Sequence, residues 1–149
     1  RDSEKMLDTL KYFLKEIGDV KGLYLVSCFF ENGKWNIDFY SEAKHKISTY
    51  TKVDDKIVAE EDDIFQADKT PLEKLDIEKV RVDFDDAVKR ISVEKERVIA
   101  ILQVIKGKIV WNLTVLTPTL ELYNLKLDAV TGEALSEKKE NIMNFRLPQ

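Results

Sequence analysis

The sequence is poor in the residues from which metal centres, disulfide frameworks and most hydrolytic sites are built. Its 149 residues include one cysteine and one histidine. This excludes an intramolecular disulfide and a metal site with several Cys or His ligands from one chain. Cys28 lies in an apolar run and is expected to be a small buried hydrophobe rather than a reactive thiol. His45 lies between two lysines in a predicted turn, so we expect it to be exposed and predict no catalytic residues.

Long apolar runs and an excess of positive charge are also missing. No run of about 18 apolar residues occurs, so no membrane span is predicted. The net charge of −4 and the pI near 5.2 argue against nucleic acid as a partner, because neutralising phosphates requires a basic surface. No signal peptide is recognisable. The chain begins with Arg1 rather than Met, however, so this absence says little about the compartment.

Neither the glycines nor the acidic residues form a recognisable ligand-binding motif. The five glycines stand singly, whereas a phosphate-binding loop needs several close together. Asp54, Asp55 and residues 60–63 could gather a hard cation such as calcium, but their spacing fits no EF-hand loop. A charge run of this kind is usually solvated. We therefore predict neither a metal ion nor a cofactor, with calcium binding at residues 54–63 as the less favoured alternative.

A pair of similar stretches, residues 35–39 and 111–115, organises the rest of the chain. Each begins Trp-Asn, follows a predicted hairpin turn and alternates apolar and polar residues as a strand does. The two stretches are about half the chain apart, so we interpret the sequence as one αβ unit written twice. Both tryptophans share a face with aliphatic neighbours and are expected in the core.

A helix and a hairpin open the first unit. Apolar residues at spacings of three and four predict a helix over residues 3–17, which Gly18 ends. Asn32-Gly33 is a favoured two-residue hairpin signal. A tight turn there gives the two strands one apolar face, with the cross-strand pairs Phe30 and Trp35, Cys28 and Ile37, and Val26 and Phe39.

The second unit repeats the order of the first. The acidic residues 60–69 are the predicted linker, and a capping box at residues 70–73 predicts a short helical turn. Asp83 then caps a helix that contains Phe84 and Ala87. Alternating segments bounded by turn residues predict strands over residues 46–53 and 57–59 in the first unit, and over residues 97–105, 109–117, 120–129 and 133–135 in the second.

Three segments of the second unit form a recognisable set: residues 83–88, residues 110–113 and the closing strand, glycine turn and strand over residues 127–135. Together they resemble the PepSY-like family over roughly residues 78–140, whereas the first unit shares only Trp35-Asn36 outright. The resemblance implies a helix packed on a curved antiparallel sheet and an extracytoplasmic or cell-envelope location. It also implies, for some members of the family, restraint of a peptidase. It carries no common catalytic residues.

The predicted fold class is α+β, with two repeated units, each a helix packed on an antiparallel β-meander of cystatin-like or PepSY-like form. The predicted domains are residues 1–66 and residues 67–149, one unit in each. The two units are expected to pack together or to exchange sheet edges.

The leading functional hypothesis is a non-catalytic module that binds or regulates a protein or peptide through a sheet edge or an open sheet face. The predicted contacts are Leu25, Phe29 and Tyr40, which lie on the side of the first hairpin opposite Trp35. A helix on one face would leave them as an exposed apolar patch, unless the second unit covers it. The alternative function is a structural segment of a larger cell-envelope protein, and a small hydrolase is the third hypothesis. The sequence leaves open whether the chain forms a homodimer.

Overall fold

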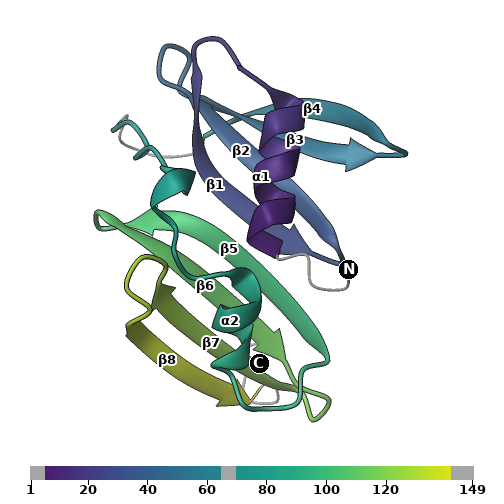
Figure 1. The fold of residues 1–149 in the computed structure, drawn as a ribbon, viewed down its shortest axis with the longest axis vertical. Helices are drawn as coiled ribbons and strands as arrows, with labels where there is room; N and C mark the ends of the chain where they lie inside the picture. Colours follow the sequence, from purple (N-terminus) through teal and green to yellow (C-terminus); the bar gives the residue numbers. More distant parts are fainter. Residues whose placement is uncertain (1–5, 65–69, 142–149) are drawn as a thin grey trace, which may run out of the picture.

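The computed structural model describes residues 6–64 and 70–141 and contains two short helices, one 3-10 turn and eight strands (Figure 1). In chain order the elements are α1 (Met6–Ile17), β1 (Leu23–Glu31), β2 (Lys34–Ser41), β3 (Lys46–Val53), β4 (Lys56–Asp63), η1 (Ile77–Lys79), α2 (Phe84–Lys89), β5 (Arg97–Ile105), β6 (Lys108–Leu116), β7 (Glu121–Asp128) and β8 (Ala134–Asn141).

All eight strands belong to one antiparallel sheet in the order β4-β3-β2-β1-β5-β6-β7-β8. Strands β1 and β5 join the two halves of the sheet through four residue pairs, from Ser27 with Gln103 to Phe30 with Ala100. The prediction of two repeated helix-plus-meander units is therefore wrong: the molecule is mainly a single continuous sheet that carries two short helices. The pairing of β1 with β5 connects residues that are far apart in the sequence, so no local sequence pattern indicates it.

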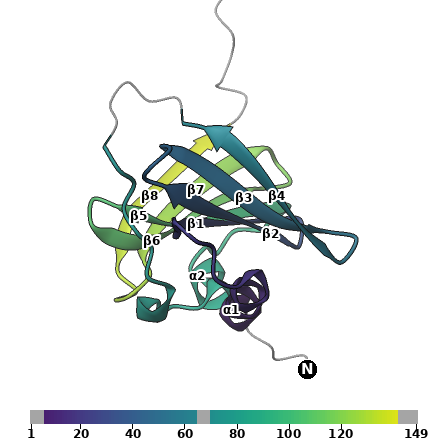
Figure 2. The same cartoon turned by 90° about the horizontal axis from the view of Figure 1, so that it is seen from above.

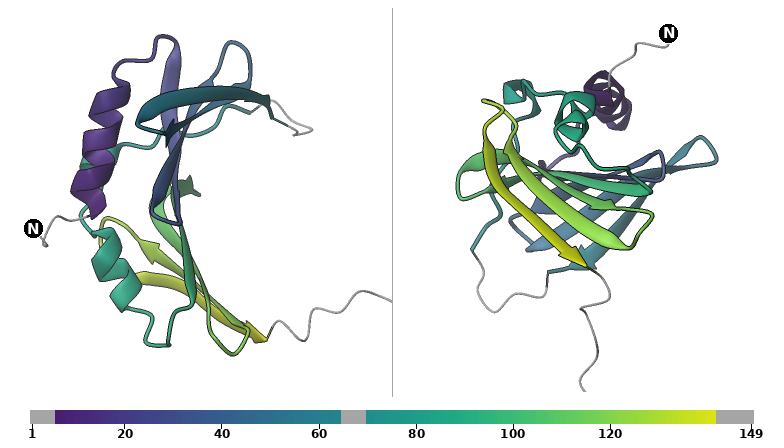
Figure 3. Two further views of the ribbon diagram at one scale, coloured as in Figure 1. Left: turned by 90° about the vertical axis from the view of Figure 1, so that its right-hand side faces the viewer. Right: turned by 90° about the horizontal axis from the view of Figure 1, so that it is seen from below.

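Both helices lie on the same face of the sheet, and the two ends of the sheet curve away from them (Figures 2 and 3). The helices therefore cover the convex face, where the main apolar core lies. Its members include Leu10 and Phe13 of α1, Ala87 of α2, and the sheet residues Leu102 and Leu113. Among the described residues, no helix or strand lies over the opposite, concave face (Figure 3). We call this surface the concave face below.

Helix α1 confirms the predicted apolar stripe over its described residues. Leu10 and Phe13 are buried, and Gly18 ends the helix with a positive φ of 77° while its N–H donates to the Leu14 carbonyl. Residues 3–5 of the predicted helix lie outside the described residues. The helical turn expected at residues 70–73 is instead η1, whose cap is Asp76.

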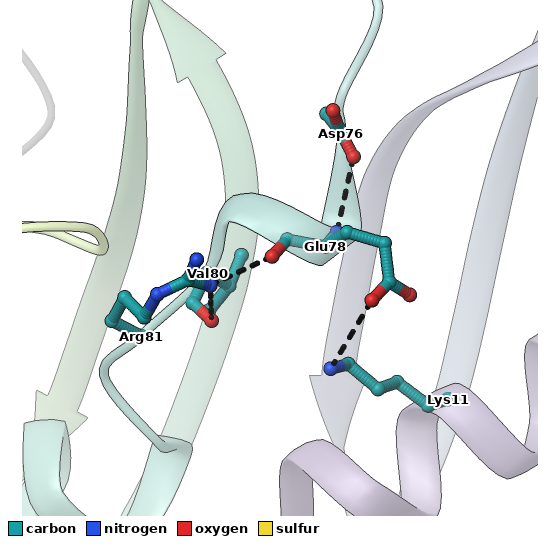
Figure 4. A network of polar contacts seen from close by, with 5 residues as sticks. All are labelled: Lys11, Asp76, Glu78, Val80 and Arg81. Carbon is teal, nitrogen blue, oxygen red and sulfur yellow. Dashed lines mark hydrogen bonds and ion pairs between the residues drawn. The ribbon is translucent and has the colours of Figure 1, made fainter.

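Polar contacts connect η1 to α1 (Figure 4). The Asp76 side chain accepts a hydrogen bond from the Glu78 N–H at 3.1 Å, and the Glu78 carboxylate lies 4.0 Å from the Lys11 ammonium. The Arg81 guanidinium donates to the Glu78 and Val80 carbonyls. These contacts are largely exposed, so they fix the direction of the chain between β4 and α2 more than they stabilise the fold.

The first hairpin forms at Asn32 and Gly33, which have φ of 54° and 75° as a type I′ turn requires. Two of the three predicted cross-strand pairs are confirmed, Phe30 with Trp35 and Cys28 with Ile37. The third is wrong, because a bulge in β1 between Leu25 and Ser27 places Leu25, not Val26, opposite Phe39. One extra residue in a strand reverses the facing of everything before it.

The edge strands are longer than predicted. β4 runs to Asp63 and so includes residues 60–63, which were expected to belong to a linker, and β8 runs through the charged residues 137–139 to Asn141. Nearly every residue of both strands is exposed, so neither strand needs an apolar side. The predicted domain boundary at residues 66 and 67 lies outside the described residues.

Candidate functional site

The structure separates the three predicted contact residues. Phe29 lies on the concave face, is half-buried and is not part of the core beneath the helices. Leu25 lies before the β1 bulge and packs against that core on the helix side. Tyr40 lies on the same side of the sheet as Phe29 but is only 1% exposed. Phe29 is thus the one of the three that the concave face presents to solvent.

Tyr40 is enclosed by a small polar and aromatic cluster. Its hydroxyl lies 2.7 Å from His45 Nδ1, and its ring meets the Tyr24 ring edge-on at 5.5 Å. The Tyr24 hydroxyl donates to the Leu72 carbonyl at 2.6 Å. Burial, followed by the negative charge of Glu42, raises the pKa of both tyrosines above its usual value. His45, expected to be exposed, is instead half-buried against Tyr40.

The segment before η1 packs beside this cluster through Tyr24. Leu72 contacts Tyr24 on the concave side, whereas Leu75 is 1% exposed within the core on the helix side. The Leu75 N–H donates to the Leu25 carbonyl at 2.8 Å. The chain therefore crosses the plane of the sheet beside the start of β1, and it covers one end of the concave face while leaving the region around Phe29 open.

The centre of the concave face is apolar. Phe29 pairs with Ile101 of β5 on one side and with Asn36 of β2 on the other. Ile99 follows on the same face of β5, since alternate residues of a strand face the same way. Phe29, Ile99 and Ile101 are all half-buried and lie outside the core beneath the helices. An apolar centre of this kind on an uncovered sheet is typical of a contact surface.

Polar side chains flank this centre on the first half of the sheet and are already paired with one another. The Asp38 carboxylate accepts hydrogen bonds from the Ser27 hydroxyl at 3.0 Å and the Thr49 hydroxyl at 2.6 Å. The three residues come from β1, β2 and β3, so they form a row across neighbouring strands. Such pairing holds the side chains in one geometry before any partner binds.

A second polar row crosses β6 and β7. The Asn124 side-chain amide donates to Asn112 Oδ1 at 2.8 Å and to the Thr114 hydroxyl at 3.1 Å, and Lys126 lies within 3.5 Å of Asn124 Oδ1. None of the residues in this half of the surface was predicted as a contact. The available signal was the alternation of polar residues along the predicted strands, which shows that they share a face but not which face stays open.

A separate hollow lies on the other side of the sheet, beneath α1. It is an open groove of about 370 Å³ between the helix, the β1–β2 turn and β3, with Tyr12, Glu16, Lys34, Trp35 and Lys52 among its walls. We call it the α1 groove. Tyr12 is 68% exposed, although Trp35 beneath it is only 6% exposed.

The remaining chemistry-bearing groups do not converge. Cys28 is completely buried, and burial raises the pKa of its thiol, which keeps it protonated and unreactive at neutral pH. Within residues 6–64 and 70–141, no group of three or more His, Cys, Asp or Glu side chains is placed to hold a metal ion. No described helix is long and apolar enough to cross a membrane.

These features define a curved, eight-stranded antiparallel sheet with helices on its convex face. Its concave face is mixed apolar and polar, and no described helix or strand lies over it. A crystal structure from Clostridium difficile 630, named as a "putative lipoprotein", is similar to it. The two chains share 14% sequence identity with a TM-score of 0.65, over 91% of this chain and 93% of the other. This likeness shows that the fold occurs in a known structure.

No family model matches the chain, and no curated protein matches it. The resemblance to the PepSY-like family therefore rests on the residues quoted above alone.

Proposed function

We propose that the protein is a non-catalytic binding module that engages a partner protein through its concave face. The observation that carries the proposal is the uncovered apolar centre formed by Phe29, Ile99 and Ile101, set between two rows of prearranged polar side chains. Protein interfaces combine an apolar centre with a hydrogen-bonding rim in this way. The curvature favours a convex partner surface over a flat one.

The polar rows support the proposal because they lower the cost of binding. Asp38 and Asn124 are fixed by side chains from neighbouring strands. A partner that adds hydrogen bonds to them does not have to order flexible groups first. Their position on a sheet, rather than on a loop, holds the surface in one shape.

Restraint of a peptidase is the finer form of this proposal, and it follows from the PepSY-like resemblance. The captured partner would then be a peptidase whose activity falls when the chain binds. A cell-envelope location is supported by the name of the similar Clostridium difficile protein. The second candidate function, a structural segment of a cell-envelope protein, would have the same location.

The test is capture of a partner from envelope and soluble fractions, with a photo-crosslinking residue placed at position 36 beside Phe29. Wild type should cross-link a defined protein. Phe29→Glu and Ile101→Glu should each reduce capture about tenfold or more, because each places a charge in an apolar contact. The matched control is Val130→Glu, since Val130 is exposed in the β7–β8 turn.

Circular dichroism and thermal unfolding must show that all variants remain folded. Equal capture by wild type and both concave-face variants would contradict the proposed surface. If no partner is captured from either fraction, the result favours the structural-segment function instead.

A further inference from the structure

The outer edge of β4 is an exposed sheet edge with two apolar side chains near its centre. β4 is the last strand at one end of the sheet, and no described strand pairs with its outer side. Ile57 and Val58 are 37% and 45% exposed. The β3–β4 hairpin also reaches beyond the other strands (Figures 1 and 2). Such an edge is a template on which another strand can pair.

The β3–β4 turn determines which backbone groups point outward from this edge. Asp54 and Asp55 both have positive φ, as in a two-residue type I′ turn. The two residues that flank such a turn form a hydrogen-bonded pair, and pairs with and without hydrogen bonds then alternate along the ladder. Ile57 and Ala59 are therefore not hydrogen-bonded to β3, and their N–H and C=O groups point outward.

Two charged side chains of β4 have no partner among the described residues. Lys56 and Glu60 both lie on the concave side of the strand, four residues apart. Four residues of a strand span about 13 Å, so the two side chains cannot pair within one chain. By contrast, Glu61 and Asp63 of the same strand both lie close to the Lys46 ammonium. An antiparallel copy of β4 would bring Lys56 of one chain opposite Glu60 of the other.

The backbone and the side chains agree on one register for two β4 strands. With a two-fold axis at Val58, this residue lies opposite itself, and Lys56 lies opposite the partner's Glu60 on both sides of the axis. Ile57 lies opposite the partner's Ala59, and each such pair exchanges both of its backbone hydrogen bonds. Every cross-strand pair between the copies is thus apolar or of opposite charge, and both kinds stabilise a sheet.

The other edge of the sheet is not self-complementary. β8 carries charged side chains at each of residues 137–140. A two-fold pairing centred on any one of them places that charge opposite an identical charge, which is destabilising. Lysines such as Lys138 and Lys139 are also typical of edge strands that are protected from association. Of the two edges, only β4 therefore suits pairing with its own copy.

We propose that two copies of this chain associate through β4, with the two strands antiparallel about Val58. The two sheets then form one continuous sheet, and the concave faces of both copies lie on the same side of it. The pairing uses no residue of the apolar centre around Phe29, so it does not depend on the proposed function. A short edge contact of this kind is typical of weak interfaces, and we expect a dissociation constant of about 10–100 μM.

The first experiment is sedimentation equilibrium of the whole chain at about 5–500 μM. Wild type should change from monomer to dimer over this range without forming larger species, because a two-fold contact occupies the edge of both copies. Ala59→Pro should weaken the association at least about tenfold, because proline removes an N–H that points away from β3. Edge strands tolerate proline at such positions, and circular dichroism of each variant checks that it remains folded.

Exchange of the charges tests the register. Lys56→Glu and Glu60→Lys should each weaken self-association about five- to tenfold, because each places like charges opposite one another on both sides of the axis. An equimolar mixture of the two variants should associate as wild type does, because every glutamate then lies opposite a lysine. Lys138→Glu on β8 is the matched control and should change nothing. Phe29→Glu should also leave the dimer intact, which separates this proposal from the proposed function.

A disulfide cross-link tests the position of the axis. Val58→Cys should form an intermolecular disulfide on mild oxidation, because facing residues of a non-hydrogen-bonded pair lie about 4.5 Å apart between Cα atoms. The native Cys28 is completely buried and does not compete. Val130→Cys is the control, because Val130 is exposed to a similar degree, at 41%, but lies at the other end of the sheet.

Three results would overturn the proposal. The first is a wild-type chain that is still monomeric at about 500 μM. The second is a dimer that Ala59→Pro and both charge variants leave intact, and the third is equal cross-linking of the two cysteine variants. None of these results bears on capture of a partner by the concave face, so the two proposals stand or fall separately.

Discussion

The two tryptophans occupy similar places on the sheet but have different surroundings. Each is the second or fourth residue of a strand that follows a hairpin, and each points toward the helices. Trp111 is closed in by Phe84 and by the segment that leads into α2, whereas Trp35 borders an open groove. The difference shows that the burial of a core residue depends on the connecting segment as much as on the strand that carries it.

The largest expected effect is the loss of Trp111. Trp111→Ala should lower the free energy of unfolding by about 3–5 kcal/mol, as expected for a fully buried large aromatic. Trp35→Ala should cost less, about 2–3 kcal/mol, because water can enter the adjoining groove. Urea unfolding of both variants measures the difference. An equal or greater cost at Trp35 would break the comparison.

Replacing each indole with a phenyl ring removes one hydrogen-bond donor and a similar amount of packing at both positions, so the difference between the two variants reports on the hydrogen bond. Trp111→Phe should cost about 1–3 kcal/mol more than Trp35→Phe, because it leaves the partly buried Val82 carbonyl without its donor. Trp35→Phe removes a donor that has no acceptor among the described residues, so we expect only the cost of lost packing, about 1 kcal/mol. Thermal unfolding of both variants measures the difference. An equal loss of stability at the two positions would contradict this expectation.

The turns of the two edge hairpins, β3–β4 and β7–β8, can be compared in the same way, and we expect smaller changes in stability there. Asp128 accepts backbone hydrogen bonds from Val130 at 2.8 Å and Thr131 at 3.0 Å, whereas the β3–β4 turn relies on Asp54 and Asp55 at positive φ. Asp128→Ala should cost about 1–2 kcal/mol at neutral pH, as loss of a capping side chain does. Asp55→Asn, which tolerates the same backbone, should be nearly neutral.

The Asp128 effect should depend on pH. The hydrogen bonds from Thr131 and Val130 lower the pKa of the Asp128 carboxyl below its ordinary value. A lowered pKa in the folded state stabilises the protein above the unfolded-state pKa of about 3.9, and this stabilisation is lost as pH falls through the folded-state pKa. The difference in stability between wild type and Asp128→Ala should therefore shrink below about pH 4. A constant difference from pH 7 to pH 2 would show that charge plays no part.

Local signals allowed much of this structure to be predicted. The Asn32-Gly33 hairpin, the apolar stripe of α1, the Asp83 cap and the inward facing of both tryptophans were predicted from patterns of residues close in sequence. The edge strands were underestimated because their exposed residues show no alternation, although backbone pairing alone suffices to extend them. The bulge beside Val26 leaves no sequence signature here, and it moved Leu25 to the helix side.

The single sheet and its concave face could not be predicted from local sequence patterns. Their defining contact, Cys28 opposite Leu102, joins residues about half the chain apart, and either residue would suit many other pairings. Phe29 was predicted as a contact residue, but Ile101 was not, because only the β1–β5 pairing brings the two together. Tyr40 was expected to be exposed, but it is buried against Tyr24 and His45, and Leu72 in turn accepts a hydrogen bond from the Tyr24 hydroxyl.

The four-residue pairing between β1 and β5 also has a consequence for how the chain folds. Every other neighbouring pair of strands in the described sheet is consecutive in the chain and can form as soon as its own turn closes. Ser27 to Phe30 must instead wait for a partner that is far away in the sequence, and closing so long a loop is slow. We therefore expect the β1–β5 pairing to be the last part of the sheet to form and the first to open under tension.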